Sequence, residues 1–495
     1  MKEKGVLKYL TIGILCLPLF LINIQSTQDW GDDFAGYLNQ AKNIAEGKPM
    51  AQTGYVQNPE YPTYAPASYP AGFPLLLAGI YAPFGINITI YNQFLNLFLI
   101  VFALLLFHYL NKYFSALISC LTVLIFIYNP WTLNFKSEIM SDIPFSVLLL
   151  LTVLLFTSEN TYKTRNIILL ILLSGFLIAI RNIGIVFLAA AIINILKNIY
   201  DGKKNSTETI FSKKVISTIV IVSGSLIFYF LIDKIFFPSR SGGLFSYNYL
   251  IDFSQLKHFL LLNLSYYMAV TRAFFEPWNN EWQFIALLTG TMVFAFIILG
   301  MIKKMTRDFK FTDTLVILYM AVILIYPYSN AGFRFMLPLA PFLLHYALVG
   351  ITNFNITWKM SHTKVSLILA LIVFSSYSQG WIELSRSKGK TLEGPFEKDN
   401  KEAFNYINEN TPANAIFSFA KPRALALFTD RKALTHRPDQ NMKELETALL
   451  TNNVDFILFN NEVSGDSIKE FIHLHENQLI KVWSNERNAI YRRQH

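Results

Sequence analysis

Asp29-Trp30-Gly31-Asp32-Asp33-Phe34-Ala35-Gly36-Tyr37 follows shortly after a hydrophobic segment, Leu7 to Ile24, that is long enough to cross a bilayer. Carboxylates at the surface of a membrane are costly unless they have a role. The stretch therefore indicates chemistry at one membrane face, and the hydrophobic segments that come after it define the remainder of the fold.

The composition is that of a polytopic membrane protein. The chain has 495 residues, of which 53% are hydrophobic and 15% charged, whereas a soluble protein averages about 25% charged residues. The net charge is +9, but the tail from Ile382 onward carries 16 basic and 16 acidic residues. The excess charge thus lies in the membrane part, where it indicates topology and not a nucleic-acid partner.

The hydropathy pattern predicts about 11 transmembrane helices, the first of them retained and not cleaved as a signal peptide. We place the spans near 6–26, 90–110, 114–130, 143–157, 166–181, 183–198, 215–237, 282–302, 314–329, 335–352 and 365–381. Inner segments then hold 17 Lys and Arg residues and outer loops hold 8. This asymmetry predicts a cytoplasmic N-terminus and an extracytoplasmic tail. The family resemblance given below implies that the membrane is a bacterial inner membrane.

The predicted organisation is a membrane module at 1–381, with outer loops at 27–89 and 238–281, and a soluble extracytoplasmic domain at 382–495. Within the second loop we expect Leu256 to Phe275 to form an interfacial or re-entrant helix. The tail alternates short strands with helices, which predicts a small α/β domain. Its expected helices are 401–408, 422–428, 441–451 and 468–475, and its expected strands are 415–419 and 454–459.

Two acidic spots at the outer ends of spans are candidate catalytic groups. Asp32 and Asp33 form the first, and Glu138 with Asp142 forms the second, at the start of the fourth span. A carboxylate at the substrate face can orient a hydroxyl and take its proton. The alternative for each spot is a solvated helix N-terminus, where Asp is favoured.

Arginines occur at the same predicted face. Arg181 and Arg334 lie at outer membrane ends, where a guanidinium suits bidentate phosphate recognition or, alternatively, reaches lipid headgroups. Carboxylates and arginines on one face predict an anionic lipid substrate that reacts beside its phosphate. The histidines are scattered, and the two cysteines lie in hydrophobic segments, so the sequence predicts no metal site and no disulfide.

The chain resembles the GT-C glycosyltransferases, in particular the bacterial branch near the protein O-mannosyltransferases and the lipid A aminoarabinose transferases. The motifs that carry this resemblance are Asp33-x-x-x-Tyr37 followed by Ala41 and Gly47, Tyr69-Pro70-x-Gly72-x-Pro74-Leu75-Leu76, Ser141-Asp142-Ile143-Pro144-Phe145, Arg181-Asn182-x-Gly184, Arg334-Phe335-x-Leu337-Pro338-x-x-Pro341 and, in the tail, Glu402-Ala403-Phe404-Asn405-Tyr406-Ile407-Asn408-Glu409-Asn410-Thr411-Pro412.

The resemblance implies a role for several of these residues. Asp33 would be the general base or the acceptor-orienting group, with Asp142 and Asp32 beside it. Arg334 and Arg181 would hold a polyprenyl phosphate. The aminoarabinose transferases carry Lys-Pro-Pro in the first loop where this chain has Tyr69-Pro70-Ala71, so the lysine contact to phosphate is either lost or replaced by Arg272 or Lys136. Tyr37, Tyr69 and Glu138 would contact substrate.

Together these features predict an inverting glycosyltransferase with a polyprenyl-phosphate sugar donor and an extracytoplasmic acceptor, which is an envelope glycan, a lipid or a protein. No cofactor is expected, and a divalent ion between Asp33 and Asp142 is the less favoured possibility. The main alternative is a transporter or flippase of lipid-linked sugars, which favours inverted repeats and mid-membrane charges. A sugar polymerase or ligase and a non-catalytic binding protein are further alternatives.

Overall fold

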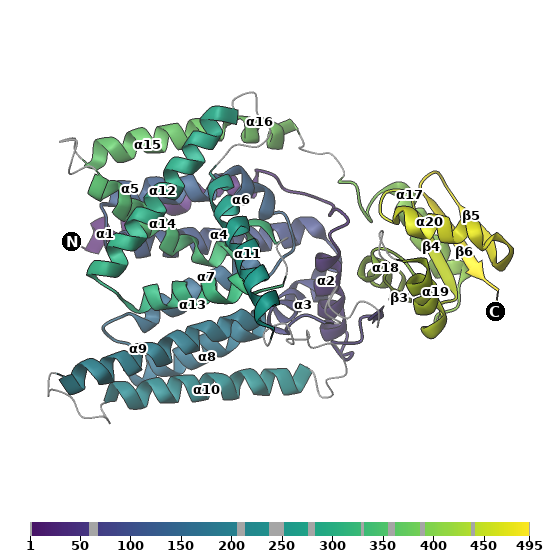
Figure 1. Cartoon of the computed structure of the whole chain (residues 1–495), viewed down its shortest axis with the longest axis horizontal. Helices are drawn as coiled ribbons and strands as arrows, with labels where there is room; N and C mark the ends of the chain where they lie inside the picture. The colour runs from purple at the N-terminus through teal and green to yellow at the C-terminus, as the bar shows by residue number, and fades with distance from the viewer. Residues whose placement is uncertain are drawn as a thin grey trace.

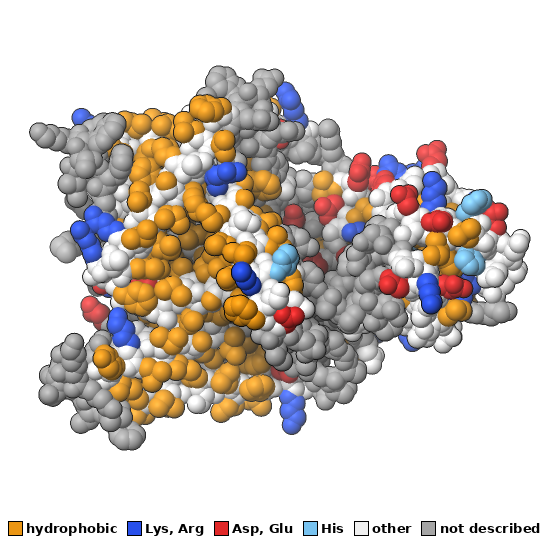
Figure 2. All heavy atoms as spheres, viewed as in Figure 1, with side chains coloured by type: hydrophobic (Ala, Val, Ile, Leu, Met, Phe, Trp, Pro, Cys, Tyr) orange, Lys and Arg blue, Asp and Glu red, His pale blue; other side chains and the backbone are white. Residues whose placement is uncertain are grey.

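A computed structural model describes residues 2–58, 68–204, 213–236, 252–275, 283–327, 331–354, 362–386, 392–436 and 441–494 of the chain. The fold has a helical part, which contains the N-terminus, and a smaller α/β part at the C-terminal end (Figure 1). The space-filling view shows hydrophobic side chains over most of the visible face of the helical part. Acidic, basic and other polar side chains mix on the C-terminal part (Figure 2).

Each of the eleven predicted spans overlaps at least one helix. The helical part comprises α1 (Lys2–Cys16), η1 (Leu17–Phe20), α2 (Asp32–Ala45), α3 (Gly72–Phe84), α4 (Ile88–Leu110), α5 (Ala116–Ile127), α6 (Pro130–Phe135), α7 (Asp142–Phe156), α8 (Thr164–Ile180), η2 (Asn182–Gly184), α9 (Ile185–Lys204), α10 (Lys213–Phe236), α11 (Phe253–Ala273), α12 (Gln283–Arg307), α13 (Phe311–Leu324), η4 (Gly332–Phe335), η5 (Leu337–Leu339), α14 (Ala340–Phe354), α15 (His362–Ser376) and α16 (Ser378–Arg386).

Fewer helices are long and apolar enough to cross a membrane than the eleven that the hydropathy pattern predicts. In the described part of the chain, four segments are long and apolar enough to cross a membrane: Ile88–Leu110, Lys213–Phe236, Leu287–Arg307 and Thr363–Arg386. Eight further apolar helices are shorter. The chain is therefore a helical membrane protein, and the number of eleven spans stays a prediction.

Local signals explain where several helices begin. The Asn87 side chain accepts a hydrogen bond from the Ile90 amide (3.3 Å) and caps α4, and Ser115 caps α5 through the Ile118 amide (3.4 Å). Asn129 caps α6, whose first residue is proline. Such caps satisfy amides that a helix leaves unpaired at its start. They also fix the short turns that reverse the chain between neighbouring helices.

Both predicted outer loops contain regular structure. The first holds α2, α3 and the short strand β1 (Tyr55–Val56). In the second, the predicted interfacial or re-entrant segment is α11, capped by Asp252 and packed against α12 and α13. Residues 237–251 and 276–282, which flank α11 in that loop, lie outside the described residues.

The C-terminal part is built on a six-stranded sheet. Its helices are α17 (Lys398–Asn410), α18 (Pro422–Thr429), α19 (Met442–Thr451) and α20 (Gly465–Leu474), with the short η6 (Glu476–Gln478), and its strands are β2 (Ile416–Ser418), β3 (Lys432–Leu434), β4 (Phe456–Asn460), β5 (Leu479–Ser484) and β6 (Asn488–Arg493). The strand order is β1-β3-β2-β4-β6-β5, with β1, β3, β2 and β4 parallel and β6 antiparallel to both of its neighbours.

The edge strand of this sheet comes from the first loop of the helical part. Tyr55 pairs with Ala433 and Val56 with Leu434, and the Gly54 carbonyl accepts a hydrogen bond from the Ala433 amide (2.9 Å). The predicted boundary between residues 381 and 382 therefore does not separate two self-contained units. Strand β1 belongs to the sheet of the C-terminal part but lies before this boundary in the sequence.

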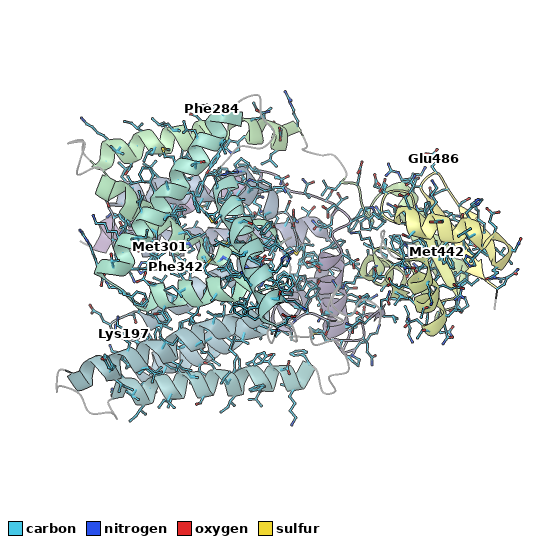
Figure 3. The ribbon with its side chains drawn as sticks, in the orientation of Figure 1. Lys197, Phe284, Met301, Phe342, Met442 and Glu486 are labelled. Atoms are coloured by element: carbon cyan, nitrogen blue, oxygen red, sulfur yellow. The ribbon has the colours of Figure 1, made fainter. Side chains whose placement is uncertain are left out.

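Helices α12 and α14 cross with their backbones in contact. A Cβ atom at Gly300 would lie 1.7 Å from the Tyr346 carbonyl oxygen, and one at Gly350 would lie 2.2 Å from that of Phe296. Figure 3 labels Met301 and Phe342, one from each helix, near this crossing. Small residues at such a crossing let two helices approach closely inside a membrane.

We predict that Gly300→Ala lowers the free energy of unfolding by about 1–3 kcal/mol, the usual cost of overpacking. Thermal unfolding of the purified protein in detergent measures this. The matched control is Gly79→Ala in α3, where an added Cβ meets no atom within 4 Å; there the change should be neutral or stabilising by about 0.5–1 kcal/mol. Equal effects of the two substitutions would contradict the proposed crossing.

Candidate active site

Four charged side chains that are far apart in sequence meet in one cluster. Figure 1 shows α2, which carries one of them, beside the C-terminal part. Asp33 lies in the first turn of α2 and Asp142 is the first residue of α7. Arg181 directly follows α8, and Arg334 lies in η4. The polypeptide therefore places both carboxylates at helix starts, where the helix dipole favours negative charge.

Arg334 bridges the two carboxylates. Its Nη1 lies 3.3 Å from Asp33 Oδ2, and its Nε lies 3.4 Å from Asp142 Oδ2. Arg181 Nη1 donates to the other oxygen of Asp142, and its guanidinium packs on the ring of Phe335 at 5.2 Å. The Asp142 side chain is fully buried, whereas 25% of Arg334 is exposed. These contacts bring together four of the residues that the sequence identified as site candidates.

A third arginine, which the sequence analysis missed, reaches this cluster from the C-terminal part. Arg423 Nη1 lies 3.4 Å from Asp33 Oδ1 and also donates to the Tyr69 hydroxyl. Its guanidinium stacks between the rings of Tyr69 (4.7 Å) and Tyr55 (5.1 Å). The only sequence signal was the position of Arg423 at the start of a predicted helix.

The predicted substrate contacts Tyr37 and Tyr69 form the aromatic wall of the site. Their rings stack at 4.2 Å between centroids, the Tyr69 hydroxyl donates to Asp33 Oδ1 (2.5 Å), and the Tyr37 and Ser141 hydroxyls lie 3.1 Å apart. Gly36 makes room for this wall, since a Cβ there would lie 2.8 Å from the Tyr69 ring and 3.1 Å from Arg423 Cδ.

The electrostatics of Asp33 favour its ionised form. Burial by itself would raise the pKa of Asp33, but the charges of Arg334 and Arg423 and the hydrogen bond from Tyr69 outweigh burial and hold that pKa below its usual value. The connected cluster contains three guanidinium groups and two carboxylates. Counted over these five ion-paired groups alone, the formal charge is +1, which matches the single negative charge of a phosphate diester.

Asp32 interacts with the start of α18, and the charge of Arg423 acts on it as well. Its Oδ1 accepts a hydrogen bond from the Ala424 amide (3.1 Å) at the start of α18, and burial raises its pKa. Its surroundings differ from those of Asp33, although the sequence treats the two as a pair.

Glu138 lines a cavity of about 220 Å³ together with Arg334, Phe333 and Trp131. Burial is the main reason that the pKa of Glu138 is raised to about 7, and the neighbouring carboxylate of Asp29 adds to the effect. The other walls of the cavity are mostly apolar, among them Leu99, Phe102, Phe126, Ile143 and Leu337.

In the described part of the chain, Arg272 and Lys136, the predicted substitutes for a phosphate-binding lysine, form no ion pair with Asp33 or Asp142. Arg272 lies in the last turn of α11. Lys136 is fully buried, its Nζ has no hydrogen-bond partner among the described residues, and burial lowers its pKa to about 7.

No three His, Cys, Asp or Glu side chains of the described ranges group as metal ligands. Arg334 bridges Asp33 and Asp142, the pair between which an ion was the less favoured prediction, and that expectation stays a prediction.

Comparison of sequences assigns the chain to a family. Residues 33–490 match the profile of DUF2079, whose description is "predicted membrane protein". The chain belongs to the DUF2079 family. No curated protein matches its sequence significantly.

Solved structures share the fold at low sequence identity. ArnT from Cupriavidus metallidurans bound to undecaprenyl phosphate is 10% identical, with a TM-score of 0.57, and the match covers 99% of this chain and 98% of ArnT. The Archaeoglobus fulgidus oligosaccharyltransferase, tethered to an acceptor peptide, is 13% identical with a TM-score of 0.52, over 93% of this chain and 69% of the other. Both are GT-C glycosyltransferases. This DUF2079 protein therefore has the GT-C fold, as the sequence motifs predicted.

We predict that Lys136→Met stabilises the protein by about 1 kcal/mol or more, because it removes a buried amine that lacks a partner. Thermal unfolding in detergent tests this, with the exposed Lys163→Met as the control. Destabilisation by Lys136→Met alone would show that the amine has a partner, such as a bound anion, and would return Lys136 to the site.

The raised pKa of Glu138 should make the stability of the folded protein depend on pH. Its pKa in the folded protein, about 7, exceeds its ordinary value of 4.5. Protonation therefore stabilises the fold fully below about pH 4.5, and this contribution is lost as the pH rises through 7. Glu138→Gln should match the wild type in unfolding temperature near pH 5 and exceed it at pH 8. The exposed Glu159→Gln should parallel the wild type at both pH values, and a similar profile for Glu138→Gln would contradict the assignment.

Proposed function

We propose that this protein is an inverting glycosyltransferase, which moves a hexosyl or pentosyl unit from a polyprenyl-phosphate donor to an extracytoplasmic acceptor. One observation carries the proposal: a cluster with one net positive charge opens through Arg334 onto a cavity with mostly apolar walls. A lipid phosphate has the matching chemistry, because it joins an anionic head to an apolar chain.

Arg334 is the arginine best placed for the donor phosphate. Its side chain is one-quarter exposed and lines the cavity, and it already lies against two carboxylates that a phosphate could partly replace. Arg181 supports it through Asp142. Charge-assisted, bidentate bonds of this type are stronger than neutral hydrogen bonds, and arginine is suited to them.

In the proposed reaction, the acceptor hydroxyl attacks the anomeric carbon from the side opposite the phosphate. A new carbon–oxygen bond forms there, while the bond from the anomeric carbon to the phosphate oxygen breaks and its electron pair leaves with the phosphate. Asp33 orients the hydroxyl and takes its proton. Arg334 and Arg181 stabilise the charge that develops on the leaving phosphate, which is often the largest catalytic contribution.

The proposed placement follows the distribution of charge. The site would lie at the outer face of a bacterial inner membrane, with the N-terminus in the cytoplasm and the acceptor glycan, lipid or protein approaching beside the C-terminal part. Lys197, which Figure 3 labels, lies toward the end of the helical part remote from the C-terminal part. A basic residue at that end supports this orientation. The donor would arrive by lateral diffusion, so the proposal includes no cofactor.

We predict that Arg334→Gln weakens the binding of undecaprenyl phosphate about 10-fold to 100-fold, the loss expected when a charge-assisted contact is removed. Binding is measured on the purified protein in lipid nanodiscs. The control is Arg165→Gln, an exposed arginine near the start of α8. Wild-type protein that fails to bind undecaprenyl phosphate would overturn the lipid-phosphate donor.

We further predict that Asp33→Asn abolishes transfer in cells. A deletion strain receives wild-type protein, Asp33→Asn or Asp142→Asn at matched membrane levels, and mass spectrometry follows its envelope glycans and lipid carriers. Loss of one sugar together with accumulation of its lipid-phosphate donor supports the transferase and identifies the sugar. Unchanged glycans in Asp33→Asn would favour the transporter or flippase.

A further inference from the structure

Helix α18 of the C-terminal part lies against α2 and is tied to it at both ends. At its start, the Ala424 amide donates to Asp32 Oδ1 (3.1 Å). Just beyond its end, Asp430 Oδ1 lies 2.6 Å from Lys42 Nζ. The two ties differ in strength, because the Asp430 side chain is 68% exposed and such surface pairs contribute little. Asp32 is partly buried, accepts a hydrogen bond from the start of α18 and faces the positive end of that helix.

The residue between Pro422 and Ala424 is Arg423, so the tie at Asp32 also positions this arginine. Proline at the first position of α18 fixes the backbone angle there. The Arg423 side chain then passes Gly36 and enters between Tyr69 and Tyr55 to reach Asp33.

Exposure separates the roles of the two arginines that contact Asp33. Arg334 is 25% exposed and lines the cavity, whereas the Arg423 side chain is only 5% exposed and is absent from the cavity wall. Arg334 contacts Oδ2 of Asp33, and Arg423 contacts Oδ1, the oxygen that also accepts the Tyr69 hydroxyl. Arg423 is therefore placed to act on Asp33 and not on the lipid phosphate.

We infer that Arg423 is a positioning residue for Asp33 and that Asp32 acts through it by holding the start of α18. The C-terminal part is thereby a component of the active site and not merely a cover over it. This inference rests on the proposed function, because it gives Asp33 its role in the reaction. When a donor phosphate draws Arg334 toward itself, Arg423 and Tyr69 still hold the Asp33 carboxylate in its orientation and in its ionised form.

The test separates donor binding from transfer in the full-length protein. Undecaprenyl phosphate is the binding probe in nanodiscs, and the glycan and lipid-carrier profile of the complemented deletion strain reports transfer. We expect Arg423→Gln to bind the probe within about 2-fold of the wild type, yet to lose transfer at least 10-fold. Arg334→Gln should lose both, and Lys42→Ala, which removes the exposed tie, should retain both.

A double-mutant cycle tests the role of Asp32. Asp32→Asn should reduce transfer in the wild-type background and have no further effect in the Arg423→Gln background, because both changes remove the same constraint. A loss of similar size in both backgrounds would show that Asp32 acts independently and would overturn its assignment.

If Arg423→Gln does not accumulate in the membrane, Arg423→Lys provides a second test of the positioning role. Lysine keeps the charge but not the planar fork of donors. We expect near-normal probe binding and unfolding temperature, with partial transfer whose acid limit lies at higher pH, because Asp33 loses part of the interaction that lowers its pKa.

Each result has a distinct meaning. A wild type that does not bind the probe overturns the proposed function. Normal transfer in Arg423→Gln, or a loss of probe binding as large as that of Arg334→Gln, overturns the positioning role while the proposed function stands.

Discussion

The bridge that Arg334 forms between Asp33 and Asp142 is the interaction on which the site depends. A buried carboxylate such as Asp142 is tolerated only with a partner, and removing one member of such a pair leaves an uncompensated charge. The bridge therefore constrains where α2, α7 and η4 can lie relative to one another. Arg181 and Arg423 extend the same constraint to α8 and to the C-terminal part. Catalytic geometry and tertiary structure depend on the same few contacts.

Much of this arrangement could be predicted because a membrane simplifies the problem. Spans must be apolar and about 20 residues long, so their ends can be located in the sequence. Charged residues at alternate ends then fall on one face or the other. Asp33, Asp142, Arg181 and Arg334 were selected on that basis, and the structure brings these four together. Position along the chain therefore identified the face on which the site lies, and the family motifs singled out Asp33 among the residues of that face.

The contribution of the C-terminal part could not be predicted in this way. Arg423 and Tyr55 reach the site through packing between segments that no membrane face orders. Asp32 is adjacent to Asp33 in sequence but faces a different partner, because successive helical residues point in different directions. Lys136 satisfied the membrane-face criterion and is nevertheless buried away from charged partners. Residue type and approximate depth in the membrane therefore predict which residues are candidates for the site. The direction in which each side chain points decides which of them belong to it.

The pairing of β1 with β3 has a consequence for biogenesis. Tyr55 and Val56 leave the ribosome long before their partners Ala433 and Leu434. At a synthesis rate of about 5–20 residues per second, the interval is on the order of 20–80 seconds. Throughout it, the first loop has an unpaired strand edge, and the sheet closes only after nearly the whole chain has been inserted. A strand of two residues limits the danger of pairing with another chain during this wait. The order of synthesis thus makes assembly of the site one of the last steps of folding.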